Sequence, residues 1–161
     1  MVALNSQFDI LRGWPNSSAV AEDFSIPAKN DTFKQGLWVS VKAGDSAGSV
    51  AVDALATSAA GVRPFLIIEG VDDYSSQFAN RVTALMGGGY VVRIPETAVD
   101  SSGASYRCFV AGHSASDFTV GQWAKVTGGL LEDVAAQDGF TEVGQVVAVD
   151  INANTIDLLV I

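Results

Sequence analysis

The sequence predicts an all-β protein, with a single β-barrel or β-sandwich body of short antiparallel strands and an extended N-terminal arm. Turn signals rich in Gly, Asn and Ser recur about every eight to fifteen residues, which is typical of sandwiches and barrels rather than of βαβ units. Apolar and polar residues alternate between these signals. Only residues 75–85 and 130–137 have a pattern that allows a helical turn or two.

The composition sets the size and class of the protein. At 161 residues the chain fits one ordinary domain that can bury a real core. Hydrophobic residues make up 48% and charged residues 17%, with 16 glycines, so we expect a globular, turn-rich chain rather than a disordered one. So few charges also suggest that partners cover part of its surface.

The predicted arm comprises residues 1–32 and the predicted body residues 33–161. Pro15 and Pro27 interrupt the first segment, which has no sustained hydrophobic period. Trp14 and Phe24 are among several apolar residues that make this segment too apolar for a solvated tail. We therefore expect the arm to dock onto the body or onto a neighbouring subunit.

One pattern occurs twice at identical spacing and is the clearest motif in the chain. Its two copies are Phe33, Gly36, Trp38, Val41, Gly44 and Phe118, Gly121, Trp123, Val126, Gly129. Each copy predicts a strand bounded by two glycine turns. The pattern has two interpretations, an internal duplication or the ordinary reuse of a glycine-bounded strand.

The same pattern places two tryptophans. In residues 37–42, Trp38 alternates with apolar residues and shares the more polar face of the predicted strand. Trp123 likewise shares a face with Lys125 and Thr127. A tryptophan on a polar strand face lies under a loop or meets a partner, so both are candidate contact residues.

Further strands and turns follow from the same reasoning. The predicted strands are residues 50–55, 64–69, 81–86, 90–94, 106–111, 143–149 and 155–161. Gly87 to Gly89 predict a tight hairpin between two of them, because glycine permits positive φ angles. Residues 152–154 predict a second hairpin.

The charge distribution restricts the expected partners. The net charge is −9, which argues against nucleic acid because such binding needs a basic face. Beyond Lys125 the sequence contains acidic residues but no Lys or Arg, so this end suits a basic protein surface. No apolar run reaches the ~18 residues of a membrane helix, and the start lacks a secretory signal pattern. With one cysteine and no internal disulfide, we expect folding in the cytoplasm and no membrane partner.

No group of residues makes a convincing reactive site. Cys108 and His113 suggest a dyad, but residues five apart on a strand point to opposite faces. Asp150 to Asp157 echo the start of a calcium loop, yet Thr155 and Ile161 stand where glycine and glutamate are needed, so a turn is favoured. We expect the acidic pairs at 72–73 and 132–133 to be solvated carboxylates in loops, because adjacent residues do not converge on a substrate. We therefore expect no enzyme activity, no cofactor and no metal.

The back two thirds of the chain resembles a known family. The residues that carry this resemblance are Arg81 to Leu85 with Gly87 to Gly89, Phe118 to Trp123, Val143 to Val147 and Thr155 to Ile161. Together they resemble the small capsid decoration, or cement, proteins of tailed bacteriophages. The motifs match by their spacing and by their general glycine-rich β pattern rather than by an invariant signature. The long apolar arm is a departure from the family.

The resemblance implies a non-enzymatic virion protein that binds the outer surface of a phage capsid and stabilises the shell. Its partner would be the major capsid protein, and a homo-oligomer, with a trimer favoured, is expected. The candidate partner-binding residues are Trp14, Phe24, Trp38 and Trp123. The alternative is a carbohydrate-binding β-sandwich module, such as a receptor-binding or fibre-associated lectin, in which exposed aromatic rings stack on sugars.

Overall fold

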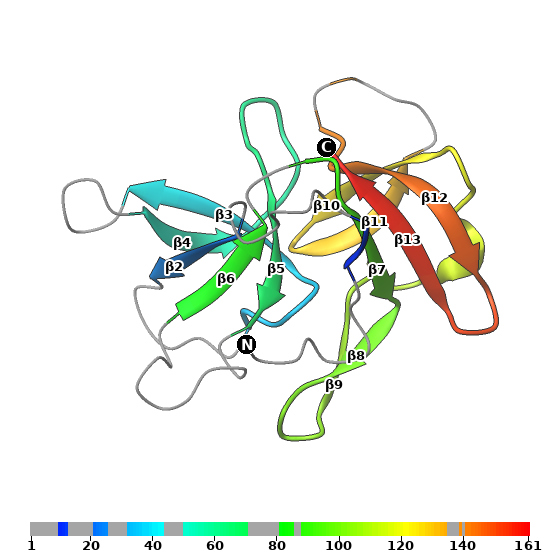
Figure 1. The fold of residues 1–161 in the computed structure, drawn as a ribbon, viewed down its shortest axis with the longest axis horizontal. Helices are drawn as coiled ribbons and strands as arrows, with labels where there is room; N and C mark the ends of the chain where they lie inside the picture. Colours follow the sequence, from blue (N-terminus) through cyan, green and yellow to red (C-terminus); the bar gives the residue numbers. More distant parts are fainter. Residues whose placement is uncertain are drawn as a thin grey trace.

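The computed structural model describes residues 10–12, 21–25, 32–43, 50–70, 81–85, 88–134, 139 and 141–161. The all-β prediction is confirmed, since the described elements are thirteen strands and one short 3₁₀ helix, η4 (Ala115–Asp117). The strands form two lobes that lie side by side (Figure 1). Among the described residues, no helix is long and apolar enough to cross a membrane.

Lobe 1 is a closed five-stranded barrel with the order β2-β4-β3-β5-β6. Its strands are β2 (Ala21–Ser25), β3 (Trp38–Ala43), β4 (Val50–Leu55), β5 (Phe65–Glu69) and β6 (Arg81–Leu85). β2 pairs antiparallel with β6 along its whole length, and the barrel closes through a parallel pairing of Ser25 with Ala51. Residues 21–25, which fall in the segment predicted as an arm, thus form a strand of this barrel.

Lobe 2 is a six-stranded sheet with the order β1-β7-β13-β12-β10-β11. Its strands are β1 (Ile10–Arg12), β7 (Val91–Pro95), β10 (Trp123–Thr127), β11 (Leu130–Val134), β12 (Gly144–Asp150) and β13 (Thr155–Val160). At one edge, Phe109 makes a parallel bridge to Leu131 of β11, so the sheet curls around its apolar face. β1 adds to β7 at the opposite edge, which again places part of the predicted arm in a sheet.

A two-stranded hairpin projects from the body below β7 in Figure 1. It consists of β8 (Thr97–Val99) and β9 (Ser105–Arg107) and is tied back to lobe 1. Lys34 Nζ lies 2.8 Å from Asp100 Oδ2, and the Tyr106 hydroxyl donates a 2.9 Å hydrogen bond to the carbonyl of Gln35. The hairpin belongs to lobe 2 by sequence but is held by lobe 1.

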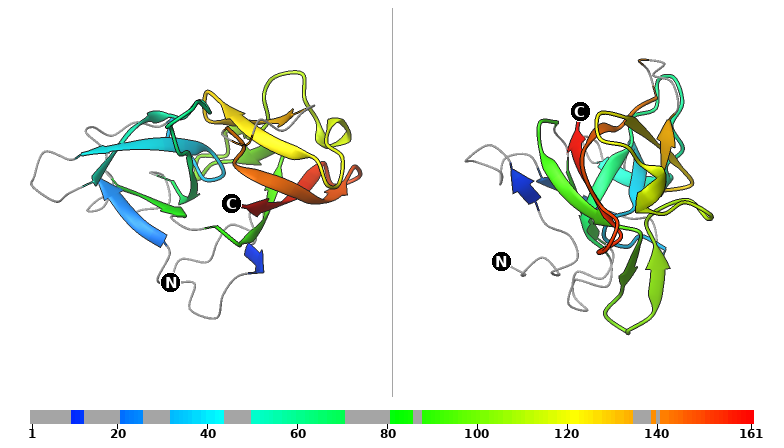
Figure 2. Two further views of the ribbon diagram at one scale, coloured as in Figure 1. Left: turned by 90° about the horizontal axis from the view of Figure 1, so that it is seen from above. Right: turned by 90° about the vertical axis from the view of Figure 1, so that its right-hand side faces the viewer.

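The two lobes repeat the same strand path. In lobe 1, β3 pairs with β4 and β5, β5 with β6, and β6 with β2. In lobe 2, β10 pairs with β11 and β12, β12 with β13, and β13 with β7. The β8–β9 hairpin is an insertion after the first strand of the second copy. Figure 2 shows both copies from two further sides.

The register of pairing is repeated as well. Trp38 lies opposite Leu66 in lobe 1, and Trp123 lies opposite Gln145 in lobe 2. The next strand adds Leu85 in lobe 1, and it adds Leu159 at the same place in lobe 2. These two rows of three residues are equivalent positions.

A register irregularity also falls at the same place in both copies. It separates Ile67 from Glu69 in β5 and Val146 from Ala148 in β12. Such bulges are specific features of a strand path rather than random defects. Of the two interpretations of the repeated sequence pattern, the structure supports a duplicated architecture.

Each lobe has its own apolar core. The lobe 1 core contains Phe33, Leu37, Val39, Val52, Ile67, Val82 and Ala84. The larger core includes Phe109, Phe118, Ala124, Val126, Leu131, Val146, Ile156 and Leu158 of lobe 2, together with Trp38, Leu66 and Leu85 of lobe 1. Successive residues Trp38 and Val39 therefore enter different cores, because neighbouring side chains of a strand point to opposite faces.

Several local predictions are wrong and have physical reasons. The hairpin predicted at Gly87 to Gly89 is wrong, because β6 pairs within lobe 1 and β7 within lobe 2; Gly87 itself lies outside the described residues. The predicted helical turns at 75–85 and 130–137 contain strands β6 and β11 where they are described. The hairpin at residues 152–154 is confirmed, because β12 and β13 pair on either side of it.

Candidate interaction surface

Trp38 is not available to a partner in this structure. Its side chain is 1% exposed, because lobe 2 covers the outer face of lobe 1 at this point. Leu66 and Leu85, its neighbours across the strands, are each 3% exposed and join the same core. The strand alternation was predicted correctly, but a second lobe rather than solvent or a partner covers the second face. The Trp38 Nε1 atom is buried without a hydrogen-bond partner among the described residues.

A run of hydrogen bonds joins the lobes beside Trp38. The Trp38 amide donates to the Gly129 carbonyl at 3.0 Å, and the Gly129 amide donates to the Ala56 carbonyl at 2.7 Å. The Ser58 amide donates to the Val126 carbonyl at 2.7 Å, while the Val126 amide donates to the Ser58 hydroxyl at 2.9 Å. We call these contacts the seam. They hold the β10–β11 turn against lobe 1, so the lobes are joined through backbone groups as well as through apolar side chains.

Trp123 differs from its counterpart. It is half-buried, at the start of a strand that is paired on both sides. Lys125 follows on the same face, and its Nζ atom lies 3.0 Å from Glu132 Oε1. Trp123 thus remains a candidate contact residue on the outer face of lobe 2. Trp14 lies outside the described residues, and the side chain of Phe24 does too, although its backbone belongs to β2.

Cys108 and His113 do not form a reactive pair. The Cys108 thiol is fully buried, and burial raises its pKa well above the ordinary value, so the nucleophilic thiolate is disfavoured. His113 Nδ1 instead lies 2.9 Å from Asp133 Oδ1. Arg107 fixes the intervening loop by donating to the carbonyls of Val110 and His113. These contacts describe a structural loop rather than a catalytic dyad.

The segment that echoes a calcium loop is a turn held by its own side chains. Asp150 Oδ1 accepts hydrogen bonds from the amides of Asn152 and Ala153 at 3.0 and 2.9 Å. Asn154 has φ 54 and accepts a hydrogen bond from the Ala115 amide at 2.9 Å through its side chain. Its amide group also donates to Glu96. Among the described residues, no group of three or more His, Cys, Asp or Glu is arranged to hold a metal ion.

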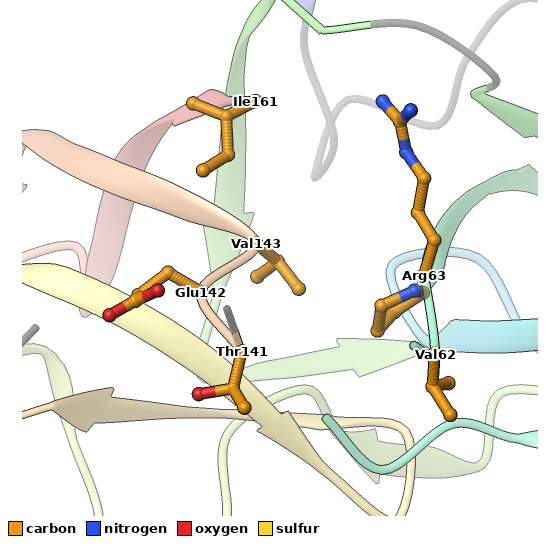
Figure 3. Close-up of a pocket in the computed structure, with 7 residues that line it drawn as sticks. Val62, Arg63, Thr141, Glu142, Val143 and Ile161 are labelled. Atoms are coloured by element: carbon orange, nitrogen blue, oxygen red, sulfur yellow. The ribbon is translucent and has the colours of Figure 1, made fainter. Parts of the chain in front are cut away.

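Two shallow grooves meet at Val62 and Arg63. One groove of about 300 Å³ lies between the lobes and is lined by Val62, Arg63, Pro64, Thr141, Glu142, Val143 and Ile161. In Figure 3 the Arg63 side chain extends along one wall, across from Val143 and Ile161. The second groove, of about 540 Å³, runs along lobe 1 and includes Ser40, Asp53, Thr57 and Phe65. Neither groove was predictable from the sequence, because residues far apart in the chain form their walls.

Comparisons with known proteins identify no relative. No family model, no curated protein and no solved structure matches this chain.

Proposed function

We propose that this chain is a non-enzymatic virion structural protein that binds the outer surface of a phage capsid and stabilises the shell. The observation that carries the proposal is the half-buried Trp123 on the outer face of lobe 2, which keeps part of its ring in solvent. A large flat side chain on a rigid strand contributes disproportionately to a protein interface, and little conformational entropy is lost on binding. The resemblance of residues 81–89, 118–123, 143–147 and 155–161 to capsid decoration proteins supports the same role.

The two-lobed construction suits a protein that must resist deformation. The seam ties the lobes by backbone hydrogen bonds, and the larger core takes side chains from both lobes. A body of this kind presents a fixed surface to a lattice. The proposal includes the major capsid protein as partner, a trimer as the assembly state and the capsid surface as the location.

Mixing the purified protein with expanded capsids that lack it tests the proposal. We expect the protein to co-sediment with the capsids and to raise the temperature at which they release DNA or lose integrity. Protein unfolded by heat and cooled serves as a control for non-specific trapping. If the native protein stays in the supernatant and capsid stability to heat and chelator is unchanged, the proposed function is wrong. The mass in solution separately tests the trimer.

A carbohydrate-binding module is the second candidate, and the lobe 1 groove is the observation that favours it. Ser40, Asp53 and Thr57 line this groove together with Phe65. Polar groups beside an aromatic face form a common arrangement in ligand pockets. Binding on a glycan array that is lost in Phe65→Ala would favour this function over capsid binding.

A further inference from the structure

We infer that lobe 2 docks onto the capsid protein through one row of side chains across its outer face, and that the partner surface is apolar with a basic rim. We call this the outer row: Val134, Trp123, Gln145, Leu159 and Val91, on β11, β10, β12, β13 and β7 in that order. The inference rests on the proposed function and specifies its binding face.

The outer row follows from the register of five neighbouring strands. Trp123 lies opposite Val134 on one side and Gln145 on the other, and Leu159 lies opposite Gln145 and Val91. All five side chains are half-buried. The next residues along the strands point inward, since Ala124 is 0% and Val160 is 4% exposed. The outer row is therefore a mainly apolar strip across one face of the sheet.

Lobe 1 shows what an equivalent row does in this fold. Its row of Trp38, Leu66 and Leu85 occupies the positions of Trp123, Gln145 and Leu159, as the pairing registers establish. Lobe 2 covers the lobe 1 row almost completely. Within the single chain, the equivalent row of lobe 2 keeps part of its surface in solvent. A protein surface is thus the kind of partner that this position already accepts once in the molecule.

Ion pairs border the outer row on the same face. Lys125 Nζ lies 3.0 Å from Glu132 Oε1, and Arg93 Nε lies 2.8 Å from Asp157 Oδ1. An apolar centre with a polar border is the usual anatomy of a protein interface. Among the side chains that the structure describes on this face, both pairs engage a cation, Arg93 and Lys125.

The charge of lobe 2 defines the rim of the partner. Residues 90–161 contain three Lys or Arg residues and nine Asp or Glu residues, and β1 adds one cation, Arg12. The three cations, Arg93, Arg107 and Lys125, each lie in an ion pair. The excess negative charge attracts a surface rimmed by Arg or Lys and repels nucleic acid and anionic membranes. Both the strip and the charge thus point to a protein partner with a basic rim.

Capsid-binding titrations of matched variants test the inference. Trp123→Ala and, separately, Leu159→Gln remove apolar area from the outer row. The control is Ile151→Ser, which alters a 66% exposed apolar residue elsewhere on lobe 2. We expect each row variant to weaken binding at least about tenfold, because central aromatic and aliphatic contacts dominate interfaces, and the control to bind like the wild type. Wild-type affinity should fall as salt is raised.

The outcomes separate this inference from the proposed function. If the wild type fails to bind capsids, the proposed function is wrong. If the wild type binds and both row variants bind equally well, the docking face is wrong while the function stands. A smaller oligomer in the row variants without capsids would assign the row to a second copy and overturn the capsid assignment. If the affinity for capsids does not change with salt concentration, the inferred basic rim of the partner surface is wrong. Circular dichroism confirms folding, and Leu159→Gln remains informative if Trp123→Ala is unfolded.

Discussion

Lobe 1 and lobe 2 have the same strand path and the same bulge, but the equivalent strands β3 and β10 differ in how deeply their outer faces are buried. In lobe 1 this strand, β3, is buried on both faces where it begins, with Val39 in one core and Trp38 in the other. In lobe 2 the equivalent strand, β10, has Ala124 in the core, while Trp123 on the other face is only half-buried. The difference shows that a repeated strand acquires its role from what packs on its outer face.

The largest difference between the lobes should appear in the stability of the two tryptophan variants. We expect Trp38→Ala to lower the free energy of unfolding by about 3–5 kcal/mol, because a fully buried ring is lost from the interface of the lobes. Trp123→Ala should cost only about 1–2 kcal/mol, since the ring is already partly in solvent. Urea unfolding followed by circular dichroism measures both. Equal losses would contradict the comparison.

The sequence predicted most of the longer strands of the body but not β1, β2, β8 or β11, and not how the strands combine. The repeated pattern located the glycine turn that precedes β3 and the equivalent turn before β10. Their glycines, Gly36 and Gly121, both have positive φ angles, 81° and 88°. Their amides make equivalent 2.8 Å hydrogen bonds, to the carbonyls of Ile67 and Val146. These positions were detectable because the backbone there requires glycine, which leaves a mark in the sequence.

The outer row and the burial of Trp38 were not predictable in the same way. The alternation in β3 separates its two faces but does not say what covers each one. Only the pairing of distant strands places Gln145 and Leu159 beside Trp123. Strand β11 was missed because Leu130 and Leu131 are adjacent and followed by two acids, which does not match a simple two-residue period.

An added methyl group should destabilise the protein more at Gly129, which lies in the seam, than at Gly121, another glycine of the same repeated pattern. Gly129 has φ 82, and a Cβ there would lie 2.8 Å from Leu55 Cδ2. Gly121 has φ 88 with open space around it. We expect Gly121→Ala to cost about 1–2 kcal/mol from backbone strain alone. Gly129→Ala should cost about 1–3 kcal/mol more, because the lobes must separate or repack. Urea unfolding of the two variants distinguishes these values, and an identical cost would mean that the seam yields easily.

Asn154 marks a place where lobe 2 departs from lobe 1, because it braces the inserted segment against the β12–β13 turn. Its side chain accepts from the Ala115 amide and donates to Glu96, and its φ is 54°. Asn154→Gly keeps the backbone conformation and should cost about 1–2 kcal/mol from the lost hydrogen bonds. Asn154→Ala should cost about 1 kcal/mol more, since alanine resists this conformation. Thermal unfolding ranks them, and a glycine variant as stable as the wild type would show that the side chain does not brace the segment.

The smallest expected effect concerns the tie between the β8–β9 hairpin and lobe 1, and it depends on pH. The hydrogen bond from Lys34 holds the pKa of the Asp100 carboxyl well below its ordinary value near 3.8, and further hydrogen bonds from Ser102 and Ala104 act in the same direction. Since the pKa is lower in the folded state than in the unfolded chain, the tie stabilises the fold above pH 3.8. This contribution is lost as the pH falls through the lower folded-state pKa.

Asp100→Asn should therefore be less stable than the wild type at neutral pH, and the difference should shrink as the pH falls from about 5 to about 2. Asp53→Asn is the matched control, because its ion pair with Lys42 is longer, at 3.5 Å, and exposed. Urea unfolding at a series of pH values measures both. A wild-type minus Asp100→Asn difference that stays constant across this range would show that the carboxylate does not tie the inserted hairpin to lobe 1, and would leave the Tyr106 hydroxyl as the tie between them.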